Sequence, residues 1–350
     1  MDVVSPPRSP ARPRSRLGRA TTLAVAALAL TGCGVRVETP PPPAPVPGPL
    51  EVVRQEAAVT SAELARDAAA AGEATLDQSL FAVLERIRLT SDEHVEALGG
   101  VYSTEEGGVI DPATTDESEL EGDEDEEGDE DADDEGADDE APADPVSPHD
   151  LVVRLAEAAA AARGAADRLE DAPLAQLLAV VGTSRLLAAD ALARTLDIDR
   201  PALGGTGVPT VLPAGVGSVD LAAVAVAEDQ AGFAFEIIAA RSPEGTIRNR
   251  ALAAATRHRA ASDAWVRLAG LTEPGLDPRS VSYALGGTAD TEESRKELGA
   301  SLEDALVTSY AALVALADAG GRAELAELHT LAAESARRWG QAPGVLPGLD

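Results

Sequence analysis

The chain has 350 residues, a formal net charge of −33 at pH 7 and only 2% aromatic residues. So negative a protein repels nucleic acid and anionic lipid surfaces, which excludes a nucleic-acid-binding protein. Its apolar residues are mostly Ala, Leu and Val. These residues favour closely packed helices over a sheet, so we predict an all-α protein.

The N-terminus has the pattern of an export signal followed by a lipid-attachment site. Five arginines precede a short apolar run, TTLAVAALAL, and small residues lead into Cys33. A run of ~10–14 apolar residues is too short to span a bilayer and is typical of a signal peptide. The pattern resembles a bacterial lipobox. We therefore predict that residues 1–32 are removed and that a lipid on Cys33 holds the protein on the extracytoplasmic face of the cell membrane. An ordinary cleaved signal followed by an incidental cysteine is the alternative. Cys33 is the only cysteine, which excludes a disulfide within the chain.

The first half of the exported chain is predicted to be a helical bundle interrupted by an acidic insert. Pro-rich residues 33–49 form a semi-rigid tether. Helical periodicity covers residues 50–103 and 149–197. Between them, residues 104–148 are rich in Asp, Glu and Gly and cannot bury enough apolar surface to fold, so we predict a disordered acidic insert. One window of the insert superficially matches a calcium loop but lacks the final Glu and the flanking helices. Weak cation buffering by residues 116–140 is the interpretation left open there.

The second half is predicted to repeat this layout. A Gly/Pro-rich linker over residues 198–217 leads into four helices within residues 218–341, and residues 342–350 form a tail. Each half contains a helical hairpin, a long connection and a second hairpin, which predicts two antiparallel four-helix bundles. The predicted helices span residues 50–71, 75–98, 149–170, 173–197, 218–241, 246–270, 292–319 and 322–340.

Four motifs mark the second half: AEDQAGFAFE, RHRAASDAW, SLEDALVTSYAAL and the closing RRWGQAPGVLPGL. Over roughly residues 218–349 they resemble an uncharacterised ferritin-like domain family of actinobacterial proteins, several of them lipoproteins. Asp229 stands where the family often has His, and Phe233 and Phe235 stand where Tyr is frequent. The resemblance implies a ferritin-like bundle and no assigned activity.

Carboxylates inside apolar helices make this second bundle the candidate site. A ferritin-like di-iron centre needs a Glu from each of two helices and a Glu-x-x-His from each of the other two. Glu228 and Glu303 lie on apolar stripes and His258 shares an apolar face, but Ala replaces the Glu three residues before each His of this half. At ~1.5 Å per residue, Glu228, His258 and Glu303 lie at one height beside an Arg, whereas His329 is offset by ~12 Å.

This layer of charged residues has two main interpretations. Buried carboxylates are costly unless they are paired, so Arg and protonated His can neutralise them in a purely structural role. Alternatively, Glu228, His258 and Glu303 hold one iron or manganese ion. An organic ligand between the helices is a third possibility. Zinc, phosphate-loop and nucleophile motifs are absent from the sequence. We therefore expect a non-catalytic binding or scaffolding module, with an envelope protein or a small ligand as its partner. A degenerate iron-handling protein or oxidase is the alternative.

Overall fold

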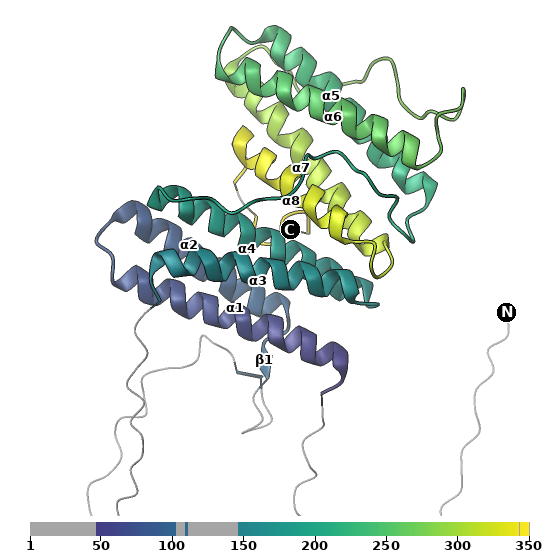
Figure 1. Cartoon of the computed structure of the whole chain (residues 1–350). Coiled ribbons are helices and arrows are strands. Elements are labelled where there is room, and N and C mark those ends of the chain that lie inside the picture. The colour runs from purple at the N-terminus through teal and green to yellow at the C-terminus, as the bar shows by residue number, and fades with distance from the viewer. Residues whose placement is uncertain (1–46, 103–108, 111–145, 343, 350) are drawn as a thin grey trace, which may run out of the picture. The chain divides into compact units, whose positions relative to one another are not determined.

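Eight helices make up most of the described chain and form four antiparallel hairpins (Figure 1). The computed structural model describes residues 47–102, 109–110, 146–342 and 344–349. The signal peptide, Cys33 and most of the tether and acidic insert lie outside the described residues, so the predictions for them stay predictions. The helices are α1 (Pro49–Glu73), α2 (Gln78–Ala97), α3 (Pro148–Arg168), α4 (Ala172–Leu196), α5 (Ser218–Arg241), α6 (Thr246–Leu268), α7 (Glu292–Leu316) and α8 (Ala323–Trp339).

The prediction of an all-α fold is confirmed. The strands among the described residues are two residues long, β1 (Val101–Tyr102) and β2 (Val109–Ile110), and they pair antiparallel with each other. Helix ends fall where the sequence supplies caps: the side chains of Asp77, Ser147 and Asp171 accept hydrogen bonds from the first turns of α2, α3 and α4. These caps explain why the helical periodicity located the helices closely.

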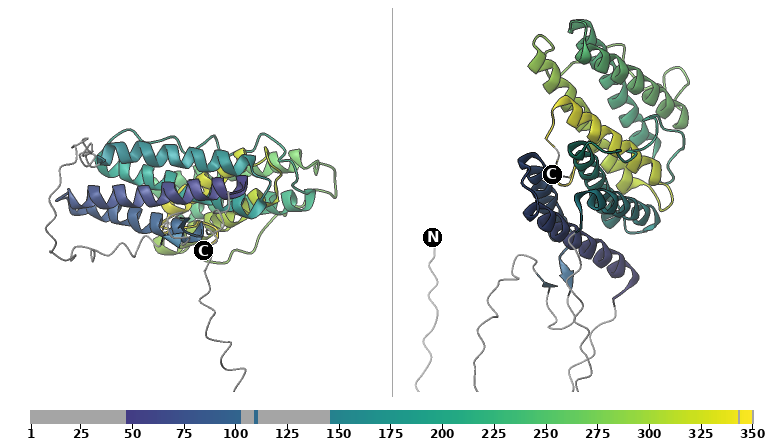
Figure 2. Two further views of the ribbon diagram at one scale, coloured as in Figure 1. Left: turned by 90° about the horizontal axis from the view of Figure 1, so that it is seen from below. Right: turned by 60° about the vertical axis from the view of Figure 1, so that its left-hand side comes forward.

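Each half folds as a four-helix bundle, as predicted. In the first half α1 packs against α2 and α3, and α4 packs against the same two helices. The left view of Figure 2 shows these helices running alongside one another. In the second half α5 packs against α6 and α7, and α7 packs against α8. Trp265, Tyr310 and Trp339 are among the largest fully buried side chains of this second bundle. Its few aromatic residues are therefore concentrated in its core.

Two of the described helices, α4 and α7, are long and apolar enough to cross a membrane. In the structure 67% of the apolar window of α4 and 56% of that of α7 is buried inside the helical body. Burial against the neighbouring helices is a sufficient reason for their apolar composition.

The two bundles are joined through one hydrophobic core. Helix α4 packs against both α7 and α8, and α3 contacts α8. One cluster of buried residues contains Leu178 and Leu187 of the first bundle together with Phe235 and Leu306 of the second. All described residues consequently belong to one compact unit.

A reciprocal pair of helix caps ties α3 to α8. Asp167, near the end of α3, accepts hydrogen bonds from the backbone amides of Arg322 (2.8 Å) and Ala323 (3.0 Å), which begin α8. In return the Arg322 guanidinium donates to the Ala166 carbonyl near the end of α3 (3.0 Å) and to the Val314 carbonyl near the end of α7 (3.0 Å). The Asp167 carboxylate thus pairs with amides at the start of α8, and the Arg322 guanidinium pairs with carbonyls near the ends of α3 and α7. Helix ends otherwise leave these amides and carbonyls unpaired. The bundles are thus fastened at their helix ends as well as through their core.

The linker of residues 198–217 lies against the second bundle. The Thr210 and Val211 amides donate to the Glu324 carboxylate in the first turn of α8, at 2.8 and 3.0 Å. Gly207 passes directly over Arg257: a Cβ there would lie 2.8 Å from the Arg257 Cδ, and its φ of +77° also favours glycine. The linker therefore covers the Arg257 side chain.

Candidate functional site

Glu228, His258 and Glu303 meet in the core of the second bundle, as the height count predicted. Glu228 comes from α5, His258 from α6 and Glu303 from α7. The His258 Nδ1 lies 2.6 Å from the Glu228 Oε2, and its Nε2 lies 3.1 Å from the Glu303 Oε1. The three residues are only 3%, 2% and 0% exposed. We refer to them, with Arg257, Tyr310 and Ser335, as the Glu228–Glu303 layer.

Aromatic residues fix the orientation of the imidazole. The Phe235 ring stacks on His258 at 5.3 Å with an interplanar angle of 10°. Trp339 stacks on Phe235 at 5.2 Å. Trp339 fits there because Gly299 of α7 has no side chain, since a Cβ would lie 2.7 Å from the Trp339 Cδ2. Phe235 therefore packs directly against the imidazole.

Glu228 receives a second hydrogen bond from a buried phenol. Tyr310, on α7, donates its hydroxyl proton to the Glu228 Oε1 in a short contact. Trp265 in turn donates its indole N–H to the Tyr310 oxygen at 3.4 Å. Burial and the adjacent Glu228 charge both raise the pKa of Tyr310 well above its ordinary value. The phenol therefore stays protonated and acts as a permanent donor.

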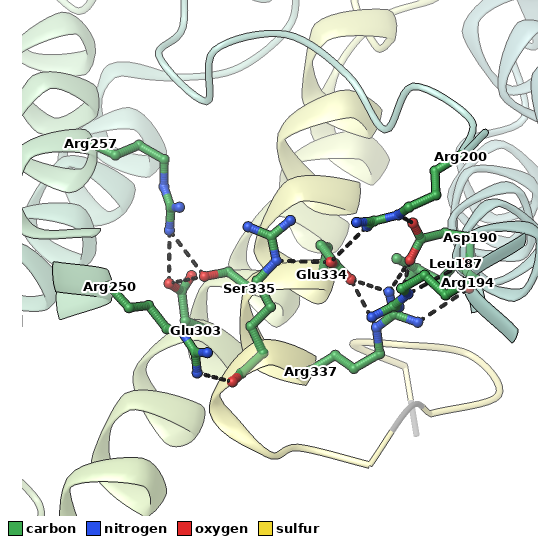
Figure 3. Close-up of polar contacts among 11 residues, drawn as sticks. Leu187, Asp190, Arg194, Arg200, Arg250, Arg257, Glu303, Glu334, Ser335 and Arg337 are labelled. Atoms are coloured by element: carbon green, nitrogen blue, oxygen red, sulfur yellow. Dashed lines mark hydrogen bonds and ion pairs between the residues drawn. The ribbon is translucent and has the colours of Figure 1, made fainter. Parts of the chain in front are cut away.

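Glu303 gathers three donors on a single oxygen. Its Oε1 accepts from His258. The same oxygen accepts from the Arg257 Nη2 at 2.8 Å and from the Ser335 hydroxyl in a short contact (Figure 3). Burial by itself raises the pKa of Glu303, but the His258 charge and the hydrogen bonds outweigh burial and hold the pKa below its usual range. The second oxygen, Oε2, is buried and has no hydrogen-bond partner among the described residues.

His258 is the cation that links the two carboxylates. Burial alone would lower its pKa, but attraction to Glu303 and Glu228 outweighs burial and raises the pKa from 6.5 to about 9. At neutral pH the ring is therefore an imidazolium, and both ring nitrogens donate to carboxylates. The Arg257 Nη2 also lies 2.9 Å from the His258 Nε2, a contact that is a hydrogen bond only when the ring is neutral. At neutral pH one imidazolium and one guanidinium thus balance two carboxylates.

In this arrangement the residues do not fit a metal centre. A metal ion needs unprotonated nitrogen and free carboxylate oxygens that converge on one point. Here the carboxylate oxygens lie at hydrogen-bonding distance from the imidazole itself, and Arg257 occupies the same Glu303 oxygen. The cavity beside the layer has a volume of about 10 Å³, close to that needed for one water molecule. Across the described residues, no group of three or more His, Cys, Asp and Glu side chains is arranged to hold a metal ion.

A second group of buried charges joins the bundles and was missed by sequence reasoning. Asp190 of α4 is 0% exposed and accepts from Arg194 at 2.6 Å, from Arg200 of the linker at 2.5 Å and from Arg337 of α8. Glu334, the residue directly before Ser335 on α8, also accepts from Arg337 (Figure 3). We call these residues, with Arg338, the Asp190–Glu334 cluster.

The charge state of Asp190 follows from these contacts. Burial raises its pKa, but the hydrogen bonds from Arg200 and Arg337 outweigh burial and lower it. The sequence did contain one signal, an Asp placed within the apolar run LLAADALARTL. Its partners could not be identified because one of them, Arg337, is 147 residues away.

His329, the other histidine of the second bundle, is not part of the Glu228–Glu303 layer, as the height count predicted. It is buried, and its ring lies between Thr183 of α4 and the C-terminal tail. His94 of α2 contacts the same tail. These two histidines therefore belong to the junction between the bundles.

Comparison with known proteins adds one match. Residues 220–350 match the model of a family described as a domain of unknown function (DUF4439). No curated protein and no solved structure matches the chain. The matched range contains all but the first two residues of α5, all of α6 to α8, the whole Glu228–Glu303 layer and the tail, and it includes the four motifs. The relation to ferritin-like proteins and the actinobacterial origin stay predictions. What the comparison establishes is a match over the second bundle to a family whose description assigns no activity.

Proposed function

We propose that this protein is a lipoprotein on the extracytoplasmic face of the cell membrane, and that its helical body is a non-catalytic binding or scaffolding module. One observation supports the proposal that the helical body is not catalytic. Both ring nitrogens of His258 are engaged by buried carboxylates, and Arg257 and Ser335 hold the same Glu303 oxygen. General acid–base chemistry needs a group that can reach a substrate, and catalytic sites are ordinarily open clefts.

The joined bundles support the scaffolding part. A shared core, the Asp167 and Arg322 caps and the Asp190–Glu334 cluster fasten the two halves into one body. A body that keeps its shape presents a fixed surface, which lowers the entropic cost of binding a partner. An envelope protein or a small ligand is the partner that we propose.

The lipid anchor can be tested directly at Cys33. When the full chain is produced in a bacterial host supplied with radioactive palmitate, we expect label on the protein and recovery in the membrane fraction. Cys33→Ser is expected to be unlabelled and released from the membrane, because the only thiol is gone. Thr39→Ala, in the predicted tether, is the matched control and should behave as the unaltered chain. An unlabelled wild-type protein would refute the anchor.

A degenerate iron or manganese protein that uses Glu228, His258 and Glu303 is the second candidate. The observation that favours it is the Glu303 Oε2, a buried carboxylate oxygen without a hydrogen-bond partner among the described residues. This candidate requires one of the two imidazole protons to leave and Arg257 to give way to the metal.

Metal addition separates the two candidates. We expect purified protein to contain no stoichiometric iron or manganese, and its Tm to stay constant when Fe²⁺ (anaerobically) or Mn²⁺ is added, because a ligand stabilises only the state that binds it. Metal content and thermal unfolding of the wild type and of Glu228→Gln provide the measurement. Stoichiometric metal that disappears in Glu228→Gln would establish the second candidate instead.

A further inference from the structure

The C-terminal tail after α8 is bonded to both bundles through histidines. His94 of α2 lies with its Nε2 3.0 Å from the Val345 carbonyl oxygen, and His329 of α8 lies with its Nε2 2.9 Å from the Pro347 carbonyl oxygen. Because a carbonyl can only accept, both Nε2 atoms carry the proton. The tail also packs closely on α7, where a Cβ on Gly348 would lie 3.1 Å from the Val307 carbonyl oxygen. One short segment thus contacts one histidine from each bundle.

The tail lies between these two rings and the solvent. His94 and His329 are each 1% exposed. The tail residues that contact them are half-buried, so the tail itself is at the surface. The Nε2 of each ring points at the tail backbone. Moving the tail would therefore bring water to both rings without unfolding a helix.

Within the described part of the chain, no carboxylate offsets the burial of either histidine. Burial, with a smaller effect of the Arg185 charge, lowers the pKa of His94 to about 4 despite the bond to the tail. Burial alone lowers the pKa of His329 to about 4, and its bond to the tail again opposes the shift. Arg185 of α4 is the charged group that acts on His94. Arg185 donates to the Ala57 and Ala158 carbonyls and to Ser61 rather than to a carboxylate.

The Nδ1 atoms have no acidic partner either. The His94 Nδ1 is buried without a hydrogen-bond partner among the described residues. The His329 Nδ1 accepts from the Thr183 hydroxyl at 2.8 Å. A proton added to His94 would be a buried, unpaired N–H beside a guanidinium, and one added to His329 would force the Thr183 hydroxyl to turn. Each added charge needs water that the seated tail excludes.

We propose that the C-terminal tail is an acid-releasable strap: protonation of His94 and His329 lifts it from both bundles. Release exposes the two rings to water at the cost of a few surface contacts, whereas hydrating them in any other way would require helices to separate. Release also widens a cavity of about 170 Å³ that the tail lines together with α4, α7 and α8. The strap does not depend on the proposed function, although a protein outside the cytoplasmic membrane meets changes in the pH of its surroundings.

The sign and size of the effect follow from linkage. A histidine whose pKa is depressed in the strapped state binds its proton more readily after release, so acid favours release. One pH unit below the ordinary pKa of 6.5, protonation of each ring raises the equilibrium constant for tail release about tenfold. The two rings together raise it about 100-fold. Near neutral pH the strap stays seated because both rings are uncharged.

Hydrogen exchange of the full chain tests the strap. Between pH 7.5 and pH 5.5, we expect the protection of backbone amides from Gln341 to Leu349, corrected for intrinsic exchange rates, to fall about 100-fold. Amides in the middle of α4 are expected to keep their protection. A double variant, His94→Gln with His329→Gln, retains N–H donors that do not titrate, so the fall should be less than about threefold.

The controls separate the strap from a general loss of stability. His149→Gln, at an exposed position in the first turn of α3, should show the wild-type fall. Each single Gln variant should reduce the fall to about tenfold. Constant protection of the wild-type tail over this pH range would overturn the proposal. So would a parallel loss of protection in α4, or an unchanged fall in the double variant.

Discussion

Replacing Glu303 by Gln is expected to lower the free energy of unfolding by about 3–5 kcal/mol, because breaking a buried ion pair leaves its partner uncompensated. Glu303 is 0% exposed and accepts from His258, Arg257 and Ser335 through one oxygen. After the substitution, one carboxylate, Glu228, faces two cations. Urea unfolding at neutral pH, followed by the helical circular dichroism signal, measures the loss. Asp304→Asn, at the exposed neighbouring position, is the matched control and should change stability by less than about 0.5 kcal/mol.

The pH dependence of this loss identifies its cause. The pKa of His258 is about 9 in the folded protein against 6.5 ordinarily. A raised pKa stabilises the fold fully below the unfolded value, and this stabilisation, about 3 kcal/mol, is lost as the pH rises through the folded value. We therefore expect wild-type stability to fall between pH 7 and pH 10, and the fall to be smaller in Glu303→Gln because one of the two attracting charges is gone. The same alkaline fall in both proteins would show that the layer does not hold His258 charged.

A structural role for the layer also accounts for its hydrogen bonds. Tyr310, Ser335 and Arg257 each donate to one of the two carboxylates, so four helices are connected through two Glu side chains. Polar contacts of this kind specify which helices pack and at what height, whereas Ala and Leu alone fit in several registers. The second bundle has few large aromatic side chains to fix how its helices align, so the polar contacts of the layer fix that alignment instead.

The helices and the layer could be predicted because both depend on local periodicity. Long helices with Asp, Ser or Thr caps show their ends in the sequence, as Asp77 and Asp171 do. The hairpin turn between α5 and α6 is short, so counting residues from that turn gives the height of Glu228 and His258 correctly. An equivalent count from the turn between α7 and α8 placed His329 at a different height from Glu303.

The junction between the bundles could not be predicted in the same way. Asp190 and Arg337 are 147 residues apart, and Arg322 and Ala166 are 156 apart. Periodicity tells which face of a helix is buried, but not which distant helix covers it. The closing segment GQAPGVLPGL has the composition of a loop, and only the positions of His94 and His329 show that it is seated on both bundles.

Asp190→Asn is expected to lower the free energy of unfolding by about 2–4 kcal/mol, and to weaken the coupling between the bundles. Asp190 is 0% exposed, whereas Arg194 and Arg200 retain about 40% of their side-chain surface and can turn to water. The Arg337 side chain, which is only 15% exposed, cannot turn to water, and Glu334 would be its remaining carboxylate partner, beside the Leu187 carbonyl. The loss should therefore be carried mainly by the pair of Asp190 and Arg337.

A double-mutant cycle tests that assignment. Urea unfolding of Asp190→Asn, of Arg337→Gln and of the double variant should give a coupling free energy of about 1–3 kcal/mol, the range for residues in one network. Asp199→Asn, at an exposed position of the linker, is the control and should be neutral. Because Asp190 lies on α4 and Arg337 on α8, losing this pair should also split the single unfolding transition into two, one for each bundle. A single transition with no coupling would mean that the shared hydrophobic core, and not the buried charges, holds the two bundles together.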